Sequence, residues 1–162
     1  MRRKPVPDPA ADVTLAAAQA AVPLVPQATD DCCARLVART GVPSADAARA
    51  WLTFMQALGL VRETEDGFVR TDRDPATAEL AEAFLDGVYG AREVVDVVEA
   101  ADAPLDATAV HDRLDIVPRW EGYRDGDPET TWRRRVGALL AWAARFELVT
   151  ATEDGYRRLT PA

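Results

Sequence analysis

The sequence predicts a mainly α-helical protein with short β-hairpins, organised as two similar units in tandem. Residues 60–70 recur 88 positions later as residues 148–158, with Leu, Val, Thr, Glu, Asp, Gly and Arg in matching places and an aromatic residue after each glycine. A strongly amphipathic stretch precedes each copy, and two shorter helical stretches precede that one. Because a repeat defines the unit of folding, we expect the order helix, helix, helix, hairpin, twice.

Each copy of the repeated segment predicts a β-hairpin. Apolar residues give way to an alternating pattern, and an Asp-Gly pair, Asp66-Gly67 or Asp154-Gly155, stands between the two halves. Such a pair favours the two positive-φ positions of a type I′ turn. We therefore expect both residues of each pair to form the turn.

The helix before each hairpin has clear boundaries and a clear apolar face. The first begins after Ser44, a good N-cap residue, and ends at Gly59; the second begins with Asp127 as N-cap and Pro128 at its first position. The apolar face of the first is formed by Ala48, Trp51, Met55 and Leu58. That of the second is formed by Trp132, Val136, Leu139, Leu140, Ala143 and Phe146.

The shorter helices complete each unit. In the first unit they span residues 12–22 and 30–40, the latter capped by Thr29 and ended by Gly41. In the second they span residues 91–101 and 107–114, the latter capped by Asp106. Asp74 and Pro75 open a connecting helix over residues 76–86, which Gly87 and Gly90 follow. The predicted organisation is a disordered tail (1–9), a first domain (10–73), the connecting segment (74–90) and a second domain (91–162).

Three helices followed by a hairpin resemble a winged helix-turn-helix domain, in which the third helix is the recognition helix and the hairpin is the wing. The resemblance rests on the turn before the third helix, the helix-to-wing junction and the wing tip: Gly41-Val42-Pro43-Ser44, Leu58-Gly59-Leu60-Val61 and Glu65-Asp66-Gly67-Phe68. In the second copy a long polar loop, residues 117–127, replaces the turn, and the junction is Phe146-Glu147-Leu148-Val149, without glycine. The chain resembles tandem winged-helix regulators of halophilic archaea, which implies binding to DNA or to protein.

The charge composition is unusual. Acidic residues outnumber basic ones by 27 to 19, for a net charge of −8, and Lys4 is the one lysine among the basic residues. This composition is typical of salt-loving archaea, although GC-rich bacterial genomes give a similar preference for arginine. At ~1 M salt the Debye length is about 3 Å, so the negative charge does not exclude DNA as a partner.

Several classes of protein are disfavoured. Two adjacent cysteines, Cys32 and Cys33, and one histidine, His111, argue against a disulfide scaffold and a metal centre. Because we find no phosphate-binding loop and no nucleophile motif, we expect no enzyme activity and no cofactor. No apolar run reaches the ~18–20 residues of a membrane span, and prolines and aspartates interrupt the amino-terminal region, so we expect a cytoplasmic protein.

The third helix of the second unit is the predicted DNA-binding surface. The outward face of the first third helix carries Asp46, Arg49, Thr53 and Gln56, which is a poor set for DNA. The outward face of the second carries Thr130, Arg134, Ala138, Ala141 and Arg145. With the flanking residues and the second wing, the predicted contacts with double-stranded DNA are Thr130, Thr131, Arg133, Arg134, Arg145, Arg157, Arg158 and Arg49.

A protein-interaction module is the alternative. Carboxylates are interleaved with these arginines, which weakens the electrostatic case for DNA. Trp120 and Tyr123 in the long loop either pack on the core or contact a partner. A homodimer through the first helix or the connecting helix is also possible.

Other polar residues favour structural roles. We expect one of the two cysteines to be in the core and the other at its edge, and His111 to be a half-buried surface residue. Glu93, Asp96 and Glu99 are predicted to form a solvated helix face.

Overall fold

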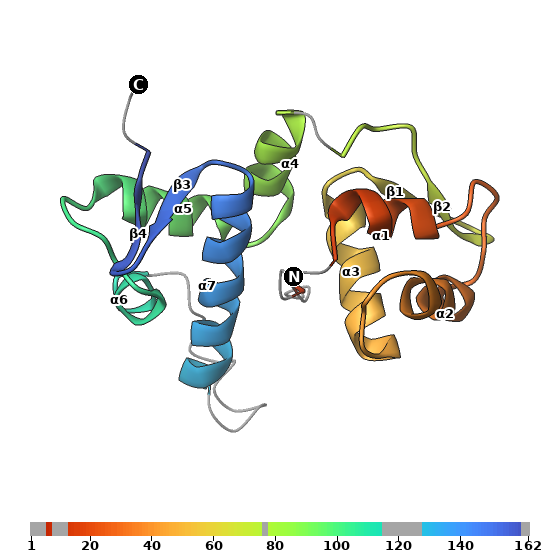
Figure 1. Ribbon diagram of the computed structural model, residues 1–162, viewed down its shortest axis with the longest axis horizontal. Coiled ribbons are helices and arrows are strands. Elements are labelled where there is room, and N and C mark those ends of the chain that lie inside the picture. Colours follow the sequence, from red (N-terminus) through yellow and green to blue (C-terminus); the bar gives the residue numbers. More distant parts are fainter. Residues whose placement is uncertain (1–5, 8–12, 76–77, 115–127, 160–162) are drawn as a thin grey trace. The chain divides into compact units, whose positions relative to one another are not determined.

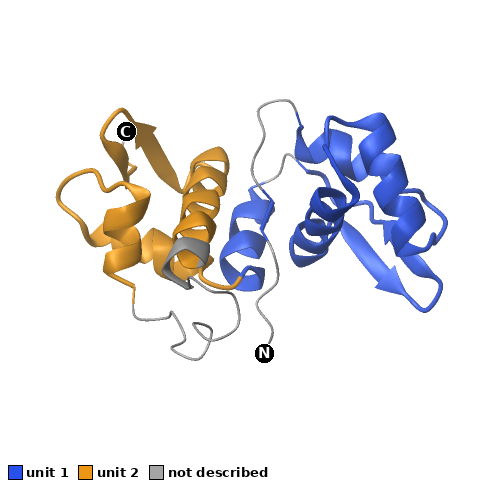
Figure 2. Ribbon diagram, turned by 90° about the horizontal axis from the view of Figure 1, so that it is seen from below, with its two compact units in different colours: residues 1–88 blue, residues 89–162 orange. Residues whose placement is uncertain are grey.

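The computed structural model describes residues 6–7, 13–75, 78–114 and 128–159, without the side chains of residues 128–131. The chain divides into two compact units, residues 1–88 and residues 89–162 (Figure 2). Unit 1 contains α1 (Leu15–Ala21), α2 (Thr29–Arg39), α3 (Ala45–Ala57), β1 (Val61–Thr64), β2 (Gly67–Arg70) and α4 (Glu79–Gly87). Unit 2 contains α5 (Ala91–Ala100), α6 (Ala107–Asp112), α7 (Pro128–Arg145), β3 (Val149–Thr152) and β4 (Gly155–Arg158). The predicted order of three helices and a hairpin is therefore present in both units (Figure 1).

The first two helices begin at different residues from those predicted. The Thr14 hydroxyl accepts a hydrogen bond from the Ala17 amide at 3.0 Å, so α1 starts later than expected; residues 8–12 lie outside the described residues. The prediction that Thr29 caps α2 is wrong, because Thr29 is its first helical residue and Ala28, which has no capping side chain, precedes it. Gly41 does not end α2 either. Thr40 is already extended, and its hydroxyl donates to the Leu36 carbonyl at 2.6 Å.

The third helix of unit 1 matches its prediction closely. The Ser44 hydroxyl accepts from the Ala47 amide at 3.1 Å, and Gly59 has a positive φ of 79° just after the helix. All four residues of the predicted apolar face are buried: Ala48, Trp51, Met55 and Leu58. It packs against α2, where Cys32 and Cys33 are both buried and form no disulfide. The prediction that one cysteine lies at the edge of the core is therefore wrong.

The helix α4 packs on α3 within unit 1. The rings of Phe54 and Phe84 meet edge to face with 6.2 Å between their centroids. Gly87 lies so close to the end of α3 that an added Cβ would be 2.7 Å from the Ala57 carbonyl oxygen. The helix starts at Glu79, later than predicted, and residues 76–77 are not described. This packing assigns α4 to unit 1.

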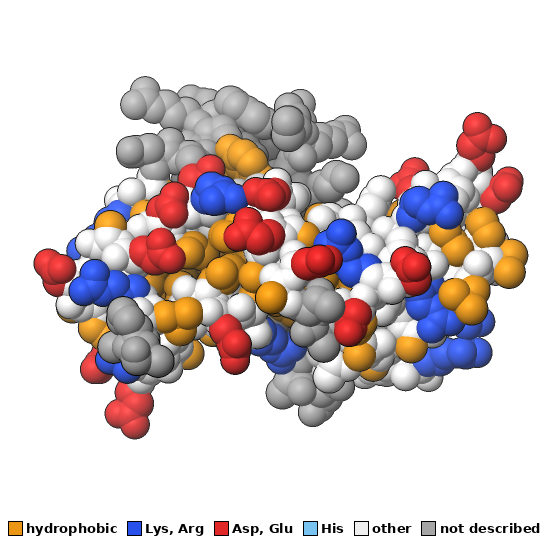
Figure 3. Space-filling model, turned by 90° about the horizontal axis from the view of Figure 1, so that it is seen from above, with side chains coloured by type: hydrophobic (Ala, Val, Ile, Leu, Met, Phe, Trp, Pro, Cys, Tyr) orange, Lys and Arg blue, Asp and Glu red, His pale blue; other side chains and the backbone are white. Residues whose placement is uncertain are grey.

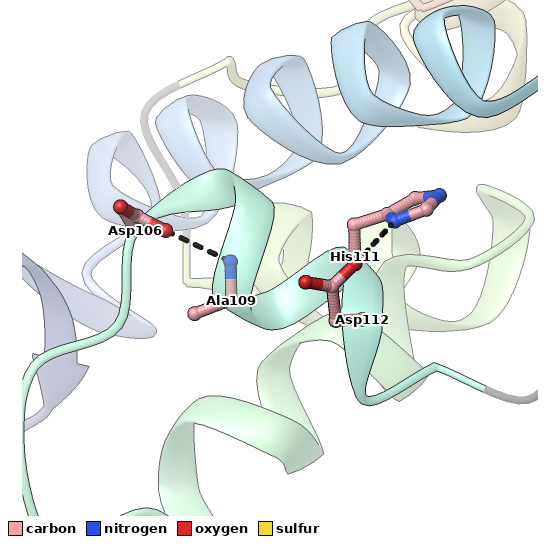
Figure 4. A network of polar contacts seen from close by, with 4 residues as sticks. All are labelled: Asp106, Ala109, His111 and Asp112. Carbon is pink, nitrogen blue, oxygen red and sulfur yellow. Dashed lines mark hydrogen bonds and ion pairs between the residues drawn. The ribbon is translucent and has the colours of Figure 1, made fainter.

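Unit 2 repeats this arrangement with a longer third helix. Asp106 caps α6 by accepting from the Ala109 amide at 2.8 Å, as predicted (Figure 4). The predicted apolar face of α7 is buried, except that Phe146 is partly exposed and stacks on Trp142 at 5.8 Å. Ala138 was expected on the outward face and is instead buried. The predicted N-cap, Asp127, lies outside the described residues.

Each hairpin gains a third, one-residue strand that the sequence did not predict. In unit 1 the amide of Gln27 donates to the carbonyl of Phe68 at 3.0 Å, and the reverse bond is 2.8 Å long. In unit 2 Leu105 and Tyr156 exchange two bonds of 2.8 Å. The segment before the second helix of each unit is thereby fixed to the middle of the wing.

The turns of the hairpins are not of the predicted type. The register pairs Thr64 with Gly67, so the turn residues are Glu65 and Asp66, and only the glycine has a positive φ, of 123°. The second hairpin pairs Thr152 with Gly155 in the same way. The third strand explains why a glycine is needed at the position after the turn. A Cβ on Gly67 would collide with the Gln27 carbonyl, so the glycine must sit beside the bridge and not within the turn.

Candidate nucleic-acid interface

The helix α7 presents arginine side chains in two different environments. Arg133, Arg134 and Arg145 are exposed. Arg135 is 7% exposed; its Nη2 donates to the Tyr89 carbonyl at 2.6 Å, and its guanidinium lies 5.9 Å from the centre of the Trp132 ring. Consecutive helical residues point about 100° apart, so the side chain of Arg134 points in a different direction from that of Arg135. Thus the exposed arginines can meet a partner, whereas Arg135 holds the start of unit 2 against α7.

Arg145 is exposed and preorganised near the carboxyl end of α7. Its guanidinium lies 5.3 Å from the centre of the buried Trp142 ring. A cation over an indole face is attracted by the ring quadrupole and loses part of its conformational freedom. Stacking therefore fixes the direction in which this arginine leaves the helix.

The equivalent helix of unit 1 has a different character. Arg49 is its exposed cation, and a guanidinium nitrogen lies 3.6 Å from a carboxylate oxygen of Asp30 on α2. Asp46 and Asp31 are also exposed at the amino-terminal ends of these two helices. Exposed carboxylates at the amino-terminal ends of α2 and α3 therefore offset the charge of Arg49.

The two arginines of the second wing leave the hairpin on opposite sides. Arg158 pairs with Val149 across the hairpin, and Arg157 pairs with Thr150. Cross-strand partners share a face and successive strand residues alternate between faces. Because Val149 is buried, Arg158 emerges on the core-facing side at the rim of the sheet, and Arg157 emerges on the outer side. The sequence could not show this, since it depends on the register of the hairpin.

This geometry agrees with what the comparisons found. The sequence matches the family model of the halobacterial double winged helix domain over residues 1–161. The chain belongs to the halobacterial double winged helix domain family. No curated protein and no solved structure gives a significant match. The tandem winged-helix fold predicted from the repeat is thus confirmed, and the acidic, lysine-poor composition fits the family's description.

Not every predicted contact residue of the double winged helix domain is described. Thr130 and Thr131 lie in the first turn of α7, at the end that enters a groove in helix-turn-helix docking, but their side chains are not described. Trp120 and Tyr123 lie outside the described residues. On the face shown in Figure 3, acidic and basic side chains are interspersed.

Within the described ranges of the double winged helix domain, no group of three or more histidine, cysteine, aspartate or glutamate residues is placed to hold a metal ion. The His111 side chain is 10% exposed, and its Nδ1 lies 3.2 Å from the adjacent Asp112 carboxylate (Figure 4). It is more deeply buried than predicted. Glu93, Asp96 and Glu99 are all exposed, as expected for a solvated face. Among the described residues, none of the helices has the length and apolarity to cross a membrane.

Proposed function

We propose that this protein is a cytoplasmic, DNA-binding transcriptional regulator in which unit 2 contacts the duplex through α7. The observation that carries the proposal is the contrast between the two third helices. α7 exposes three arginines, Arg133, Arg134 and Arg145, whereas α3 exposes one, Arg49, which lies 3.6 Å from Asp30. Guanidinium groups on a recognition helix bind guanine edges in the major groove and phosphates beside it.

The wing of unit 2 contributes to this surface through one of its two arginines. Arg157 emerges on the outer side of the hairpin, where the wing of a docked domain meets the phosphate backbone. Arg158 emerges on the other side. We therefore assign a phosphate contact to Arg157 alone, and its removal should flatten the slope of log affinity against log salt by about one unit.

The test is binding of the purified protein to a duplex selected from a random library, measured by fluorescence anisotropy over a range of KCl concentrations. Arg134→Glu should weaken binding by at least about ten-fold, which corresponds to the loss of one good base contact. Arg49→Glu is the matched control on the equivalent helix of unit 1 and should leave the affinity within about two-fold. Equal effects of the two variants, or no effect of Arg134→Glu, would overturn the assignment of unit 2.

A protein-interaction module is the second candidate, and one observation favours it. Leu24 and Val25 are 70% and 66% exposed between two prolines in the segment that joins α1 to α2. Adjacent exposed apolar residues of this size are a feature of protein contacts. If Leu24→Ser with Val25→Ser abolishes capture of a specific protein from native lysate while duplex binding is unchanged, unit 1 has this role.

A further inference from the structure

A groove of about 560 Å³ lies beside β4 in unit 2. One wall is the segment 101–104, which joins α5 to α6, and the other is formed by Arg157, Arg158 and Leu159. The groove starts where the bridge between Leu105 and Tyr156 ends. Its described lining includes no residue of α7, and Arg157 is the residue that it shares with the proposed DNA surface.

The same place in unit 1 is closed. After the bridge between Gln27 and Phe68, the chain stays beside the strand, and the Arg70 amide donates to the Pro23 carbonyl at 2.9 Å. In unit 2 the two equivalent residues are Arg158 and Ala101, and no hydrogen bond joins them in the described part of the chain. The repeat therefore supplies an internal comparison in which one sheet edge is paired and the other is open.

The open edge has a defined hydrogen-bonding direction. Both backbone groups of Tyr156 bond to Leu105, so they point away from β3. In an antiparallel pair, residues two apart on a strand direct their backbone groups to the same side. The amide and carbonyl of Arg158 consequently face the groove. An unpaired edge of this kind is a template for the addition of another strand.

The charge of the groove favours an acidic occupant. Arg158 is exposed and makes no ion pair with any described residue, and Asp102 is the carboxylate among the described lining residues. Guanidinium groups bind carboxylates through two parallel hydrogen bonds. Leu159, 47% exposed, and Pro104 add an apolar part to the lining.

We propose that this groove binds an extended acidic segment of a partner protein, which pairs with the free backbone edge at Arg158 while a carboxylate of the segment contacts the Arg158 side chain. This inference goes beyond DNA binding by α7 and does not depend on it. The internal comparison supplies the geometry, and the Arg158 guanidinium supplies the charge preference.

The experiment uses the full chain and a blocked hexapeptide of alternating glutamate and valine, with amide hydrogen exchange as the readout. At saturating peptide the exchange of the Arg158 amide should slow by at least about ten-fold, because that amide gains an acceptor. The same peptide with lysine for glutamate should give no protection. Unchanged exchange at Arg158 with the acidic peptide, or equal protection by the lysine peptide, would overturn the proposal.

Variants separate this site from the proposed DNA surface. Arg158→Glu should weaken peptide binding by at least about ten-fold, whereas Arg62→Glu, the matched change of an exposed wing arginine in unit 1, should not. Exchange of the Leu105 and Tyr156 amides checks that the wing is still folded. Arg134→Glu should keep full peptide binding, so failure of one proposal is distinguishable from failure of the other. If a duplex protects the Arg158 amide and the peptide does not, the groove binds nucleic acid and the proposal is wrong.

Discussion

Gly59 and Glu147 occupy the same position after the third helices of the two units, and both have left-handed backbone conformations, with φ of 79° and 60°. In each unit the following residue donates its amide to the helix carbonyl five residues earlier at 2.9 Å. This is the arrangement of a Schellman C-cap, which glycine adopts without strain. A residue with a side chain pays about 1–2 kcal/mol for the same conformation. Unit 2 therefore carries local strain that unit 1 avoids.

Glu147→Gly should stabilise unit 2. We expect the free energy of unfolding of this unit to rise by about 1 kcal/mol, since the relief of strain exceeds the added entropy of an unfolded glycine. Slower exchange of the Leu148 amide, which donates to Ala143, measures the effect. Gly59→Ala should destabilise unit 1 by a similar amount. Two changes of the same sign would contradict the shared-cap interpretation.

Gly155→Ala should disrupt the second wing. Its φ is 130°, and a Cβ would lie 2.5 Å from the Leu105 carbonyl, so the bridge to Tyr156 must open. Backbone strain of about 1–3 kcal/mol and the loss of two hydrogen bonds of about 1 kcal/mol each set the scale. Hydrogen exchange should show faster exchange of the Leu105 and Tyr156 amides.

Gly137 provides the matched comparison for the preceding substitution. It lies within α7, and among the described residues a Cβ there would meet only Ala107, at a distance of 3.9 Å. Gly137→Ala should therefore stabilise the helix by about 0.5–1 kcal/mol. Destabilisation by this substitution would show that α6 and α7 pack more closely than described.

Arg135 should contribute to the stability of unit 2, and Arg134 should not. Arg135→Ala removes a 2.6 Å bond to the Tyr89 carbonyl and the contact with Trp132, and should lower the free energy of unfolding of unit 2 by about 2 kcal/mol. Arg134→Ala should change it by less than about 0.5 kcal/mol. Chemical denaturation followed by the signals of the α7 amides measures the free energy of unfolding of both variants. A large loss in Arg134→Ala would mean that its weakened DNA binding reflects misfolding.

The duplicated fold and much of the core followed from local patterns. Ser44 and Asp106 cap their helices by contacts within three residues, and Trp51 and Trp132 lie on continuous apolar stripes. Such features depend on neighbours in sequence, so periodicity and capping rules detect them. The exposure of Arg134 followed from the same helical projection.

The features that the sequence did not predict depend on distant contacts. Gln27 and Leu105 form one-residue strands, which have no alternation to detect. The sequence signal for these strands was that they are 78 residues apart and that each follows a proline, Pro26 or Pro104. The hairpins are 88 residues apart, and the two spacings differ because of the loop before α7. The burial of both Cys32 and Cys33 likewise depends on how α2 packs.

Cys32 and Cys33 should make stability depend on alkaline pH. Burial is the main cause that raises the pKa of both thiols above the ordinary value of 9.0, so the folded state disfavours the thiolate. As pH rises, the two thiols ionise in the unfolded chain before they ionise in the folded chain. The contribution of the neutral thiols to the free energy of unfolding is therefore complete below about pH 8.5 and is lost as pH rises toward the pKa of the folded state. Cys32→Ala with Cys33→Ala should therefore flatten the fall in the free energy of unfolding of unit 1 above that pH, measured by denaturant unfolding. A thiol reagent at pH 8 should modify the native chain slowly and the unfolded chain quickly, and rapid modification of the folded protein would refute the burial of this pair.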